Sequence, residues 1–398
     1  MVKKSIIFVI ESLGTGGAEI SLLNLLEEFD YTKYDVYLQL LSLNTELIHL
    51  LNKNVKIIPS PEYISFLSTD SISCLKKIKN QPLKWFLTRY LFSMLLRLNK
   101  ISKKEQLDKL YWQTHKKSFT TLNRKFDVAI AYTQGIPTYY VHDKIIAAKK
   151  ITWMNAKYEL PGNLKSYNKH FYENFNTIVT VSSFLKRYLL SSLFPEYQNK
   201  TIVIRDILNV KKIKEKSEEQ LSEKIYCRPL IVTVGRYNWS KGYEFAIKAA
   251  AELKKRNIDF VWWAVGYGPL QNELQELINQ FNLENNFILL GKRENPYPYI
   301  EKCDIYVQPS RNEGFGLTIA EAKILNKPMV CTSFEGHDMQ IKDGENGLVA
   351  TYDPEDIADK IECLINDQEL YNKIKCNLKQ EKAENSDEIQ KLYYLINL

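Results

Sequence analysis

Two glutamates separated by seven residues flank a Gly-x-Gly turn in the run 311–322. An apolar strand is expected at 305–307 just before this run, and a helix is expected from Leu317 onward. The first turn of a helix carries unpartnered backbone N–H groups, and its dipole favours an anion. Glu313 and Glu321 could accept hydrogen bonds from hydroxyl groups on either side of that anion. A phosphate flanked by diols is the chemistry of a nucleotide sugar.

A second loop places two cations at the end of another expected strand. The apolar run 231–234 ends in Gly235-Arg236, and Lys241 follows five residues after the arginine. A guanidinium offers a planar fork of N–H groups and an ammonium offers a point charge, so the two together suit a pyrophosphate. Solvated loop charges would explain either residue alone, but the whole pattern favours a diphosphate site.

Three more strand-to-glycine joints occur along the chain. In the second half, the strand expected at 260–265 ends in a Gly-x-Gly-Pro turn, and the strand expected at 286–290 ends in Gly-Lys. At the N-terminus, the apolar strand 6–10 enters a loop with Gly16 and Gly17, and a helix rich in leucine follows. That opening is typical of a Rossmann-like half, although the dinucleotide spacing Gly-x-Gly-x-x-Gly is absent.

Together these segments resemble the retaining glycosyltransferases of glycosyltransferase family 4, which have the GT-B fold. The run 313–321 is similar to their Glu-x7-Glu signature, the loop 235–242 to their Gly-Arg…Lys-Gly loop, and 16–19 to their Gly-Gly-Ala-Glu loop. The run 295–299, Asn-Pro-Tyr-Pro-Tyr, resembles bacterial polysaccharide glycosyltransferases in particular. The resemblance leaves residues 60–125 unexplained.

The resemblance implies a role for each matching residue. The implied catalytic residues are Glu313, Arg236, Lys241 and Asn155. The residues expected to bind the sugar donor are Gly16, Gly17, Gly235, Gly266, Gly291, Lys292, Asn295, Tyr297, Gly314, Phe315, Gly316, Leu317 and Glu321. Within this set, Glu313 would contact the transferred sugar, and Glu321 would hold the ribose hydroxyls.

The mechanism that the resemblance implies needs neither a metal nor a strong protein base. No Asp-x-Asp motif occurs, so no metal site is expected, and Arg236, Lys241 and the helix at Leu317 must carry the leaving-group charge. The family retains the anomeric configuration by front-face attack, and the leaving phosphate receives the proton of the acceptor.

One position departs from the family pattern. Many relatives carry Trp-Ile-His after the strand that matches 150–153, and that His contacts the donor sugar, whereas this chain has Trp153-Met154-Asn155. An asparagine can hydrogen-bond a sugar hydroxyl but cannot carry a proton charge. A different donor, a substitute residue or a loss of activity would each account for the change.

Length and composition bound the class of protein. A chain of 398 residues with 45% apolar content suits two domains, and its six cysteines show no Cys-x-x-Cys spacing. No stretch reaches the ~18 apolar residues of a membrane span, and the apolar core before Glu11 is too short for a secretory leader. A cytoplasmic location is therefore expected.

Strands alternate with helices almost throughout, which predicts an α/β fold of the GT-B type. We expect two Rossmann-like domains that face each other across a cleft, with a C-terminal helix that crosses back to the first domain. The expected ranges are an acceptor-side domain at 1–210, a connection at 211–227, a nucleotide-sugar domain at 228–375 and a helical segment at 376–398. Strands of the first domain are expected near 4–10, 35–41, 55–58, 128–132, 150–153, 177–181 and 201–204.

Positive charge is concentrated in an insertion at about 76–125. This insertion holds fourteen Lys or Arg and two acids, a local charge of +12 in a chain of net charge +7. Within it, 82–100 has a wide apolar face edged by cations, which is typical of an interfacial helix. The residues expected to contact a membrane or a lipid-linked acceptor are Lys84, Trp85, Phe86, Arg89, Leu91 and Arg97. A helix buried under the first domain is the alternative, and no recognised nucleic-acid module surrounds the aromatics.

The expected function is that of a metal-independent, hexosyltransferase-type retaining glycosyltransferase. It would move a sugar from a nucleotide sugar, UDP-linked rather than GDP-linked, to a growing lipid-linked bacterial surface polysaccharide such as a capsule. No cofactor and no nucleic acid partner is expected, and the location would be peripheral, on the inner face of the cell membrane. Two alternatives stay open: a non-catalytic partner subunit of another transferase, and a sugar-nucleotide epimerase or phosphorylase on the same fold.

Overall fold

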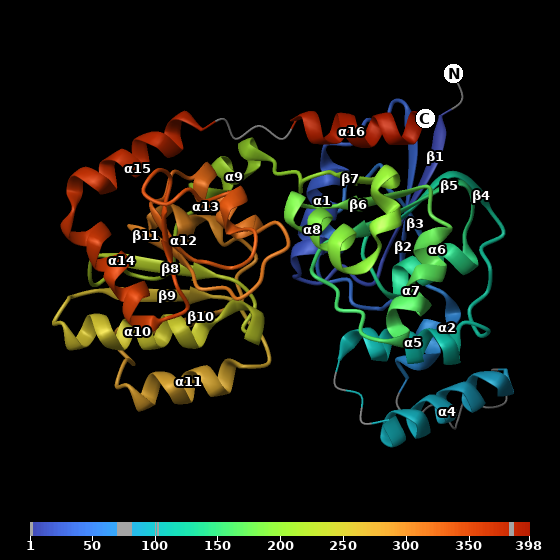
Figure 1. Ribbon diagram of the computed structural model, residues 1–398, viewed down its shortest axis with the longest axis horizontal. Coiled ribbons are helices and arrows are strands. Elements are labelled where there is room, and N and C mark those ends of the chain that lie inside the picture. The colour runs from blue at the N-terminus through green and yellow to red at the C-terminus, as the bar shows by residue number, and fades with distance from the viewer. Residues whose placement is uncertain (1–2, 70–81, 100, 102, 382–385) are drawn as a thin grey trace. The chain divides into compact units, whose positions relative to one another are not determined.

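The computed structural model describes residues 3–69, 82–99, 101, 103–381 and 386–398 of the chain. The chain forms two units (Figure 1): unit 1 comprises Met1–Ile207 and Ser386–Leu398, and unit 2 comprises Leu208–Asn385. Each unit is built on one parallel sheet with helices between its strands, as the alternating sequence pattern predicts.

Unit 1 contains a seven-stranded sheet in the order β3-β2-β1-β4-β5-β6-β7. Its strands are β1 (Lys4–Ile10), β2 (Tyr34–Leu40), β3 (Lys56–Ile58), β4 (Lys125–Ala131), β5 (Ile146–Met154), β6 (Thr177–Thr180) and β7 (Thr201–Val203). Its helices are α1 (Gly17–Glu27), α2 (Glu62–Leu67), α4 (Leu83–Asn99), α5 (Lys104–His115), α6 (Ile136–Lys144), α7 (Asn163–Glu173), α8 (Ser183–Tyr188) and α16 (Ser386–Asn397). The continuous apolar run of β1 suits a parallel strand that is covered on both faces.

Unit 2 contains a six-stranded sheet in the order β10-β9-β8-β11-β12-β13. Its strands are β8 (Leu230–Val234), β9 (Val261–Val265), β10 (Phe287–Gly291), β11 (Ile305–Gln308), β12 (Met329–Thr332) and β13 (Leu348–Ala350). Its helices are α9 (Val210–Ser217), α10 (Tyr243–Lys255), α11 (Gln271–Gln280), α12 (Tyr297–Lys302), α13 (Leu317–Ile324), α14 (Pro354–Asn366) and α15 (Gln368–Gln380).

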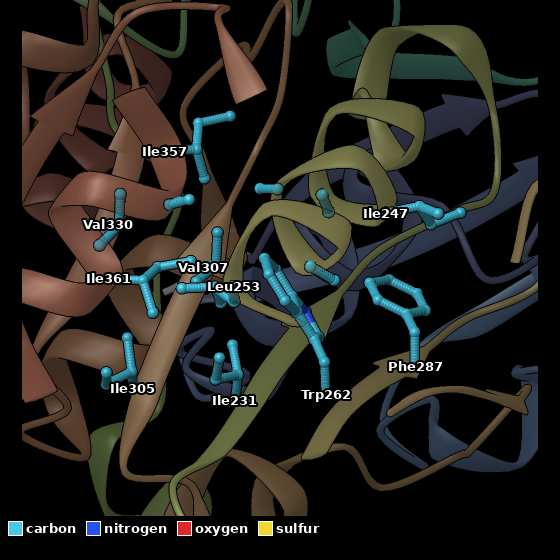
Figure 2. Packing of buried hydrophobic residues seen from close by; sticks show 14 of the residues in the cluster. Ile231, Ile247, Leu253, Trp262, Phe287, Ile305, Val307, Val330, Ile357 and Ile361 are labelled. Atoms are coloured by element: carbon cyan, nitrogen blue, oxygen red, sulfur yellow. The ribbon is translucent and has the colours of Figure 1, made fainter. Parts of the chain in front are cut away.

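The core of unit 2 lies on both faces of its sheet. Along β9, Trp262 belongs to the cluster under α10, α11 and α14, whereas its neighbour Trp263 belongs to the cluster under α12 and α13. Figure 2 shows Trp262 near Phe287 of β10 and the side chains of α10. The indole of Trp262 is fully buried and donates to Thr233 Oγ1 at 3.0 Å, so its one polar atom is satisfied. These two cores hold the strand ends at fixed positions.

The C-terminal helix α16 packs on unit 1, as the sequence predicted for the last helix. The Tyr393 ring stacks on Tyr34 with ring centroids 5.3 Å apart, and its hydroxyl accepts from the Asp30 N–H at 2.7 Å. The Lys149 ammonium donates to the Leu395 carbonyl at 2.7 Å. This helix therefore completes the first unit although it comes last in the chain.

The charged segment 211–227, expected as the connection, lies inside unit 2. Its helix α9 begins at the cap residue Asn209, whose side chain accepts from the Lys212 N–H at 2.8 Å. Ile213 is buried in the same core as α12 and α13, whereas Lys211 and Lys214 are exposed to solvent. The charge of this segment is thus that of the solvent face of an amphipathic helix.

Helix α4 lies where the sequence predicted a helix, but it turns a different face outward. Trp85 is only 6% exposed, packed against Tyr63 and Phe66, and Phe86 is half-buried against the Phe66 ring. The proposed contact of Trp85 with a membrane is therefore wrong, because the residue belongs to the core of unit 1. Within the described residues, no helix is long and apolar enough to span a membrane.

Candidate active site

The predicted site residues of unit 2 meet where its strand order reverses. β8 and β11 are neighbours in the sheet, although β9 and β10 come between them in the chain. In parallel α/β sheets, ligands bind at the carboxyl ends of the strands beside such a reversal. The loop 235–242 leaves the carboxyl end of β8, and the loop 309–316 leaves that of β11.

Glycines allow these loops to approach one another closely. A Cβ on Gly242, whose φ is +61°, would lie 2.0 Å from the Pro309 carbonyl oxygen, so only glycine permits the two loops to touch. A Cβ on Gly266 would lie 1.9 Å from the Gly235 carbonyl oxygen, and the Gly266 N–H donates to the Gly291 carbonyl at 3.0 Å. Gly235, Gly266 and Gly291 thus pack three strand ends together.

The contact of the two loops pairs Lys241 with Glu313. The Lys241 ammonium lies 2.7 and 2.8 Å from the two carboxylate oxygens of Glu313. Oε1 of Glu313 also accepts from Ser310 Oγ at 2.7 Å and from Gln308 Nε2 at 3.1 Å. Because the Glu313 side chain is only 8% exposed, these contacts hold its carboxylate in one orientation.

Gln308, which helps to hold Glu313, is itself held in place. Its Oε1 accepts from the Tyr306 hydroxyl at 2.6 Å and from Thr318 Oγ1 at 3.1 Å. Because the Glu313 carboxylate can only accept, the Gln308 amide nitrogen must face it, and the amide oxygen therefore faces the two hydroxyls. Gln308, the last residue of β11, therefore links the Tyr306 and Thr318 hydroxyls to the Glu313 carboxylate through hydrogen bonds.

Arg236 differs from Lys241, although both follow β8. Its side chain is exposed, and its guanidinium makes no ion pair or hydrogen bond with the part of the chain that the structure describes. Its backbone carbonyl accepts from the Asn238 N–H at 2.8 Å, which shapes the turn. The guanidinium therefore remains available to an anion at the carboxyl end of β8.

The N-terminus of α13 presents unpaired backbone donors. Gly316, at φ +84°, caps the helix, and its carbonyl accepts from the N–H groups of Ile319 and Ala320 at 3.0 and 3.1 Å. The successive N–H groups from Gly314 to Thr318 have no acceptor among the described residues. Such a run of donors at a helix start binds phosphate or carboxylate oxygens.

Glu321 lies one turn into α13 in a very different environment from Glu313. It is 4% exposed, and the Tyr297 hydroxyl donates to its Oε1 at 3.3 Å. Burial raises the pKa of Glu321 from 4.5 to about 8, against the weaker lowering effect of the tyrosine. In the free protein at neutral pH, this carboxyl group therefore keeps its proton and can both donate and accept.

Two predicted residues of the nucleotide side have local roles. The Asn295 amide donates to the Lys216 carbonyl at 2.8 Å, and its Oδ1 accepts from the Tyr297 N–H at 3.2 Å. Asn295 thus joins α12 to α9 and orients the tyrosine that contacts Glu321. Lys292 is exposed to solvent beyond β10.

The predicted residues of unit 1 lie at the carboxyl ends of β1 and β5. Gly16 precedes α1, and a Cβ there would lie 2.2 Å from Oε2 of Glu19, a side chain that also accepts from Ser12 Oγ at 3.0 Å. Gly17 is the first residue of α1. The Asn155 Nδ2 donates to the Tyr132 carbonyl at 2.6 Å, while its Oδ1 is buried without a partner among the described residues.

A buried acid near α1 was not among the residues predicted from sequence. Asp206 follows β7 and accepts from Ser21 Oγ at 2.5 Å, and the same Ser21 Oγ lies 2.8 Å from the Tyr132 hydroxyl. Burial raises the pKa of Asp206 to about 7. Its position at a strand end is the one signal that could have indicated it. Among the described residues, no group of three or more His, Cys, Asp or Glu is placed to hold a metal.

Comparison with known proteins adds a family match. Residues 211–381 match the sequence model of the family described as glycosyl transferases group 1, which is less than half of the chain. The chain is 27% identical over 372 residues, or 87% of its length and 86% of the relative's, to the N-acetylgalactosamine-N,N'-diacetylbacillosaminyl-diphospho-undecaprenol 4-alpha-N-acetylgalactosaminyltransferase of Campylobacter jejuni. It is 31% identical over 169 residues to an uncharacterized glycosyltransferase of Methanocaldococcus jannaschii, covering 41% of each protein.

The extent of these similarities differs between sequence and structure. The chain spans between 38% and 53% of the length of three curated relatives. The structure of Anabaena HepE in complex with UDP and glucose matches 99% of both chains with a TM-score of 0.68 at 17% identity. At that identity the likeness shows the fold alone, and it confirms the expected GT-B class. The matches together support a group 1 glycosyltransferase.

The pairing of Lys241 with Glu313 makes a stability prediction. Lys241→Ala removes the cation from a carboxylate that is 8% exposed, so we expect the free energy of unfolding to fall. The expected loss is about 2 kcal/mol, the size of a hydrogen bond to a charged group. Adding Glu313→Gln should recover part of it, because the neutral amide needs no cation. Urea unfolding of both single variants and the double variant measures the coupling energy between Lys241 and Glu313. If the two single losses of stability simply add up in the double variant, the two side chains do not stabilise each other.

The environment of Glu321 makes a pH prediction. The unfolded chain releases the Glu321 proton near pH 4.5, whereas the folded chain keeps it to about pH 8. The contribution of this group to stability therefore falls as pH rises between these values and then stays constant. Glu321→Gln should match the parent near pH 4 and exceed its thermal stability at pH 9. Parallel stability curves for the two proteins from pH 4 to 9 would rule out the raised pKa.

Proposed function

We propose that this chain is a retaining, hexosyltransferase-type glycosyltransferase that uses a nucleotide sugar. The observation that carries the proposal is the run of unpaired N–H groups from Gly314 to Thr318 beside the Lys241–Glu313 pair. Arg236 adds an unpaired cation on the neighbouring strand end. A diphosphate requires such donors, and a sugar requires an oriented carboxylate such as Glu313.

The proposed reaction replaces one bond at the anomeric carbon with another on the same face. The bond between C1 and the diphosphate oxygen breaks, and a bond between C1 and the acceptor oxygen forms. The proton of the acceptor hydroxyl passes to the leaving phosphate, so no side chain acts as a strong base. Arg236, Lys241 and the start of α13 stabilise the charge that develops on the leaving group.

The two glutamates take different parts in this scheme. Glu313 is held by a cation and two neutral donors, and it would accept hydrogen bonds from hydroxyls of the transferred sugar. Glu321 has a raised pKa, so its carboxyl group could donate to one ribose oxygen and accept from the other hydroxyl. Asn155, in place of the family His, would offer its unpartnered Oδ1 to the sugar.

The proposed substrates are a UDP-sugar and a lipid-linked glycan. The Campylobacter relative is named for a diphospho-undecaprenol acceptor, and Anabaena HepE was solved with UDP and glucose. We propose a similar acceptor in the synthesis of a bacterial surface polysaccharide, on the cytoplasmic face of the membrane. The presence of Arg236, Lys241, Glu313 and Glu321 argues against a non-catalytic partner subunit, because such a subunit needs none of them.

A screen of nucleotide sugars tests the proposed function. UDP-sugars and GDP-sugars are compared by thermal shift, since a ligand at 100 times its Kd stabilises the folded state by about 2.7 kcal/mol. Release of UDP from the best donor is then followed with and without EDTA, and turnover should survive the chelator. If no nucleotide sugar shifts the melting temperature, the proposal fails, and turnover restored only by Mn²⁺ or Mg²⁺ would contradict the metal-independent scheme.

Arg236→Ala should slow turnover without changing the fold. The exposed guanidinium supports no described contact in the free protein, so the melting temperature should stay constant. Loss of one preorganised charge at the leaving group lowers kcat by roughly a hundredfold. Lys255→Ala, which removes an exposed cation at the far end of α10, is the matched control. Parent-like turnover in Arg236→Ala would remove the diphosphate role.

The structure changes which face of α4 we propose for the membrane. The exposed apolar side chains of this helix form one stripe at helical spacing, namely Leu83, Leu87, Tyr90, Leu91, Met94 and Leu98. Lys84 and Arg97 are exposed on the same helix, and its sequence holds no acid. Arg89 instead lies against unit 1, with its guanidinium 5.8 Å from the centre of the Phe66 ring. A wide apolar stripe edged by cations favours an anionic lipid surface over a protein partner.

Changing this stripe should release the protein from membranes. We expect the triple variant Leu87→Ser, Tyr90→Ser and Met94→Ser to lose binding to anionic vesicles, since these side chains are 60%, 72% and 40% exposed. A matched control changes Ile57, Tyr226 and Tyr394 to Ser, which are exposed apolar residues elsewhere on the chain. Co-sedimentation at low and high salt separates the apolar from the ionic part, because salt screens only the latter. The membrane contact would be refuted if the parent protein stayed in the supernatant while the vesicles sedimented.

A further inference from the structure

A second ligand-binding edge lies in unit 1, where its own strand order reverses. β1 and β4 are neighbours in that sheet, with β2 and β3 between them in the chain. The first half of α5 lies over the carboxyl ends of three strands. Lys104 contacts Glu11 after β1 at 3.3 Å, and Lys103 contacts Glu159 after β5 at 2.7 Å. Asp108 approaches Gly135 after β4.

Asp108 carries a buried carboxyl group that has no hydrogen-bond partner among the described residues. It is 4% exposed, and its side chain makes no hydrogen bond or ion pair with the described residues. A Cβ on Gly135, whose φ is +83°, would lie 2.4 Å from Oδ2 of Asp108, so the acid occupies the space that a side chain would fill. A buried carboxyl group that stays unpaired opposes folding, and such groups require an explanation.

A second unpaired acceptor lies on the next strand end. The Asn155 Oδ1 is buried without a partner, and because its Nδ2 must donate to the Tyr132 carbonyl, the orphan atom is the oxygen. Gln134, the residue before Gly135, accepts from the Asn155 N–H at 3.1 Å and so joins the two strand ends. Two buried acceptors without hydrogen-bond donors, Asp108 and Asn155, thus lie near the carboxyl ends of β4 and β5.

The surrounding charges indicate the chemical class of the ligand. Lys104 contacts Glu11 at 3.3 Å and acts on Asp108 only at longer range, and a cation this near to both acids disfavours a metal ion. Glu11, Glu105 and Asp108 together repel a phosphate. The Tyr139 and Tyr158 hydroxyls lie 3.3 Å apart beside Asp108 and bond to each other. A neutral ligand rich in hydroxyl groups suits this edge, because a hydroxyl supplies the hydrogen-bond donor that Asp108 lacks.

We propose that Asp108 binds hydroxyls of the acceptor sugar, on the edge of unit 1 formed by α5 and the carboxyl ends of β1, β4 and β5. The inference rests on the proposed glycosyltransferase function. Asp108 would fix the acceptor sugar through hydroxyls that do not react, while the reacting hydroxyl passes its proton to the leaving phosphate. Asp108 thus sets the position of the acceptor and takes no proton.

Asp108→Asn tests the proposal, because the amide keeps the shape but loses a charged acceptor. Two rates are measured with the UDP-sugar that gives the largest thermal shift. The first is release of UDP when water replaces the acceptor, and the second is transfer of labelled sugar into membranes of the source cells. We expect release to water to stay constant. Transfer should fall roughly tenfold to a hundredfold, as for loss of a hydrogen bond to a charged group. Glu173→Gln, an exposed acid at the end of α7, is the matched control.

A stability measurement separates this role from a structural one. Burial raises the pKa of Asp108 to about 7, so its ionised form opposes folding above that pH. Asp108→Asn should therefore melt at the same or a higher temperature than the parent at pH 8, while it transfers less. Parent-like transfer in this variant, or an equal fall of transfer and release to water, would overturn the proposal. A parent protein that neither binds nor cleaves any nucleotide sugar would instead refute the proposed function.

Discussion

The approach of two backbone segments at the β8–β11 boundary governs the geometry of unit 2. A side chain on Gly242 would collide with the Pro309 carbonyl at 2.0 Å, so the loops after β8 and β11 touch only because this position is glycine. That contact brings Lys241 within 2.7 Å of Glu313. Ser310 and Gln308 then orient the same carboxylate from the β11 side. The position of the charged groups thus follows from a steric condition on the backbone.

The two glutamates of one motif show how burial assigns different chemistry to identical side chains. Glu313 receives a cation and two neutral donors, whereas Glu321 receives one tyrosine hydroxyl at 3.3 Å and is only 4% exposed. Enclosure raises the pKa of Glu321 to about 8. Within one short motif, an acceptor-only group in the loop thus precedes a group in the helix that can also donate. A sequence motif records the spacing of the two carboxyl groups but not their protonation.

Structural features that depend on neighbouring residues in the chain, such as strands and turns, were predictable from the sequence. Features that depend on tertiary contacts, such as which side chains are buried, were not. The strand Lys4–Ile10 and the glycine joint before Leu317 follow from periodicity and turn chemistry. The outward face of α4 was not predictable, because its apolar residues surround the helix and only contact with Tyr63 and Phe66 decides that Trp85 is buried. The burial of Asp108 was not predictable either, because its carboxyl group lies against Gly135, which is distant in sequence.

The two units present opposite kinds of unpaired polar group at equivalent places in their sheets. At the β8–β11 boundary, unit 2 offers donors: the N–H groups from Gly314 to Thr318 and the guanidinium of Arg236. Near the β1–β4 boundary, unit 1 offers acceptors: the carboxylate of Asp108 and the amide oxygen of Asn155. A diphosphate carries acceptors and requires donors, whereas an uncharged sugar carries hydroxyl donors that satisfy buried acceptors. Burial without a hydrogen-bond partner is unfavourable for Asp108 and Asn155, whereas the Arg236 guanidinium is exposed to solvent. Ligands of complementary chemistry on the two units would satisfy both kinds of group.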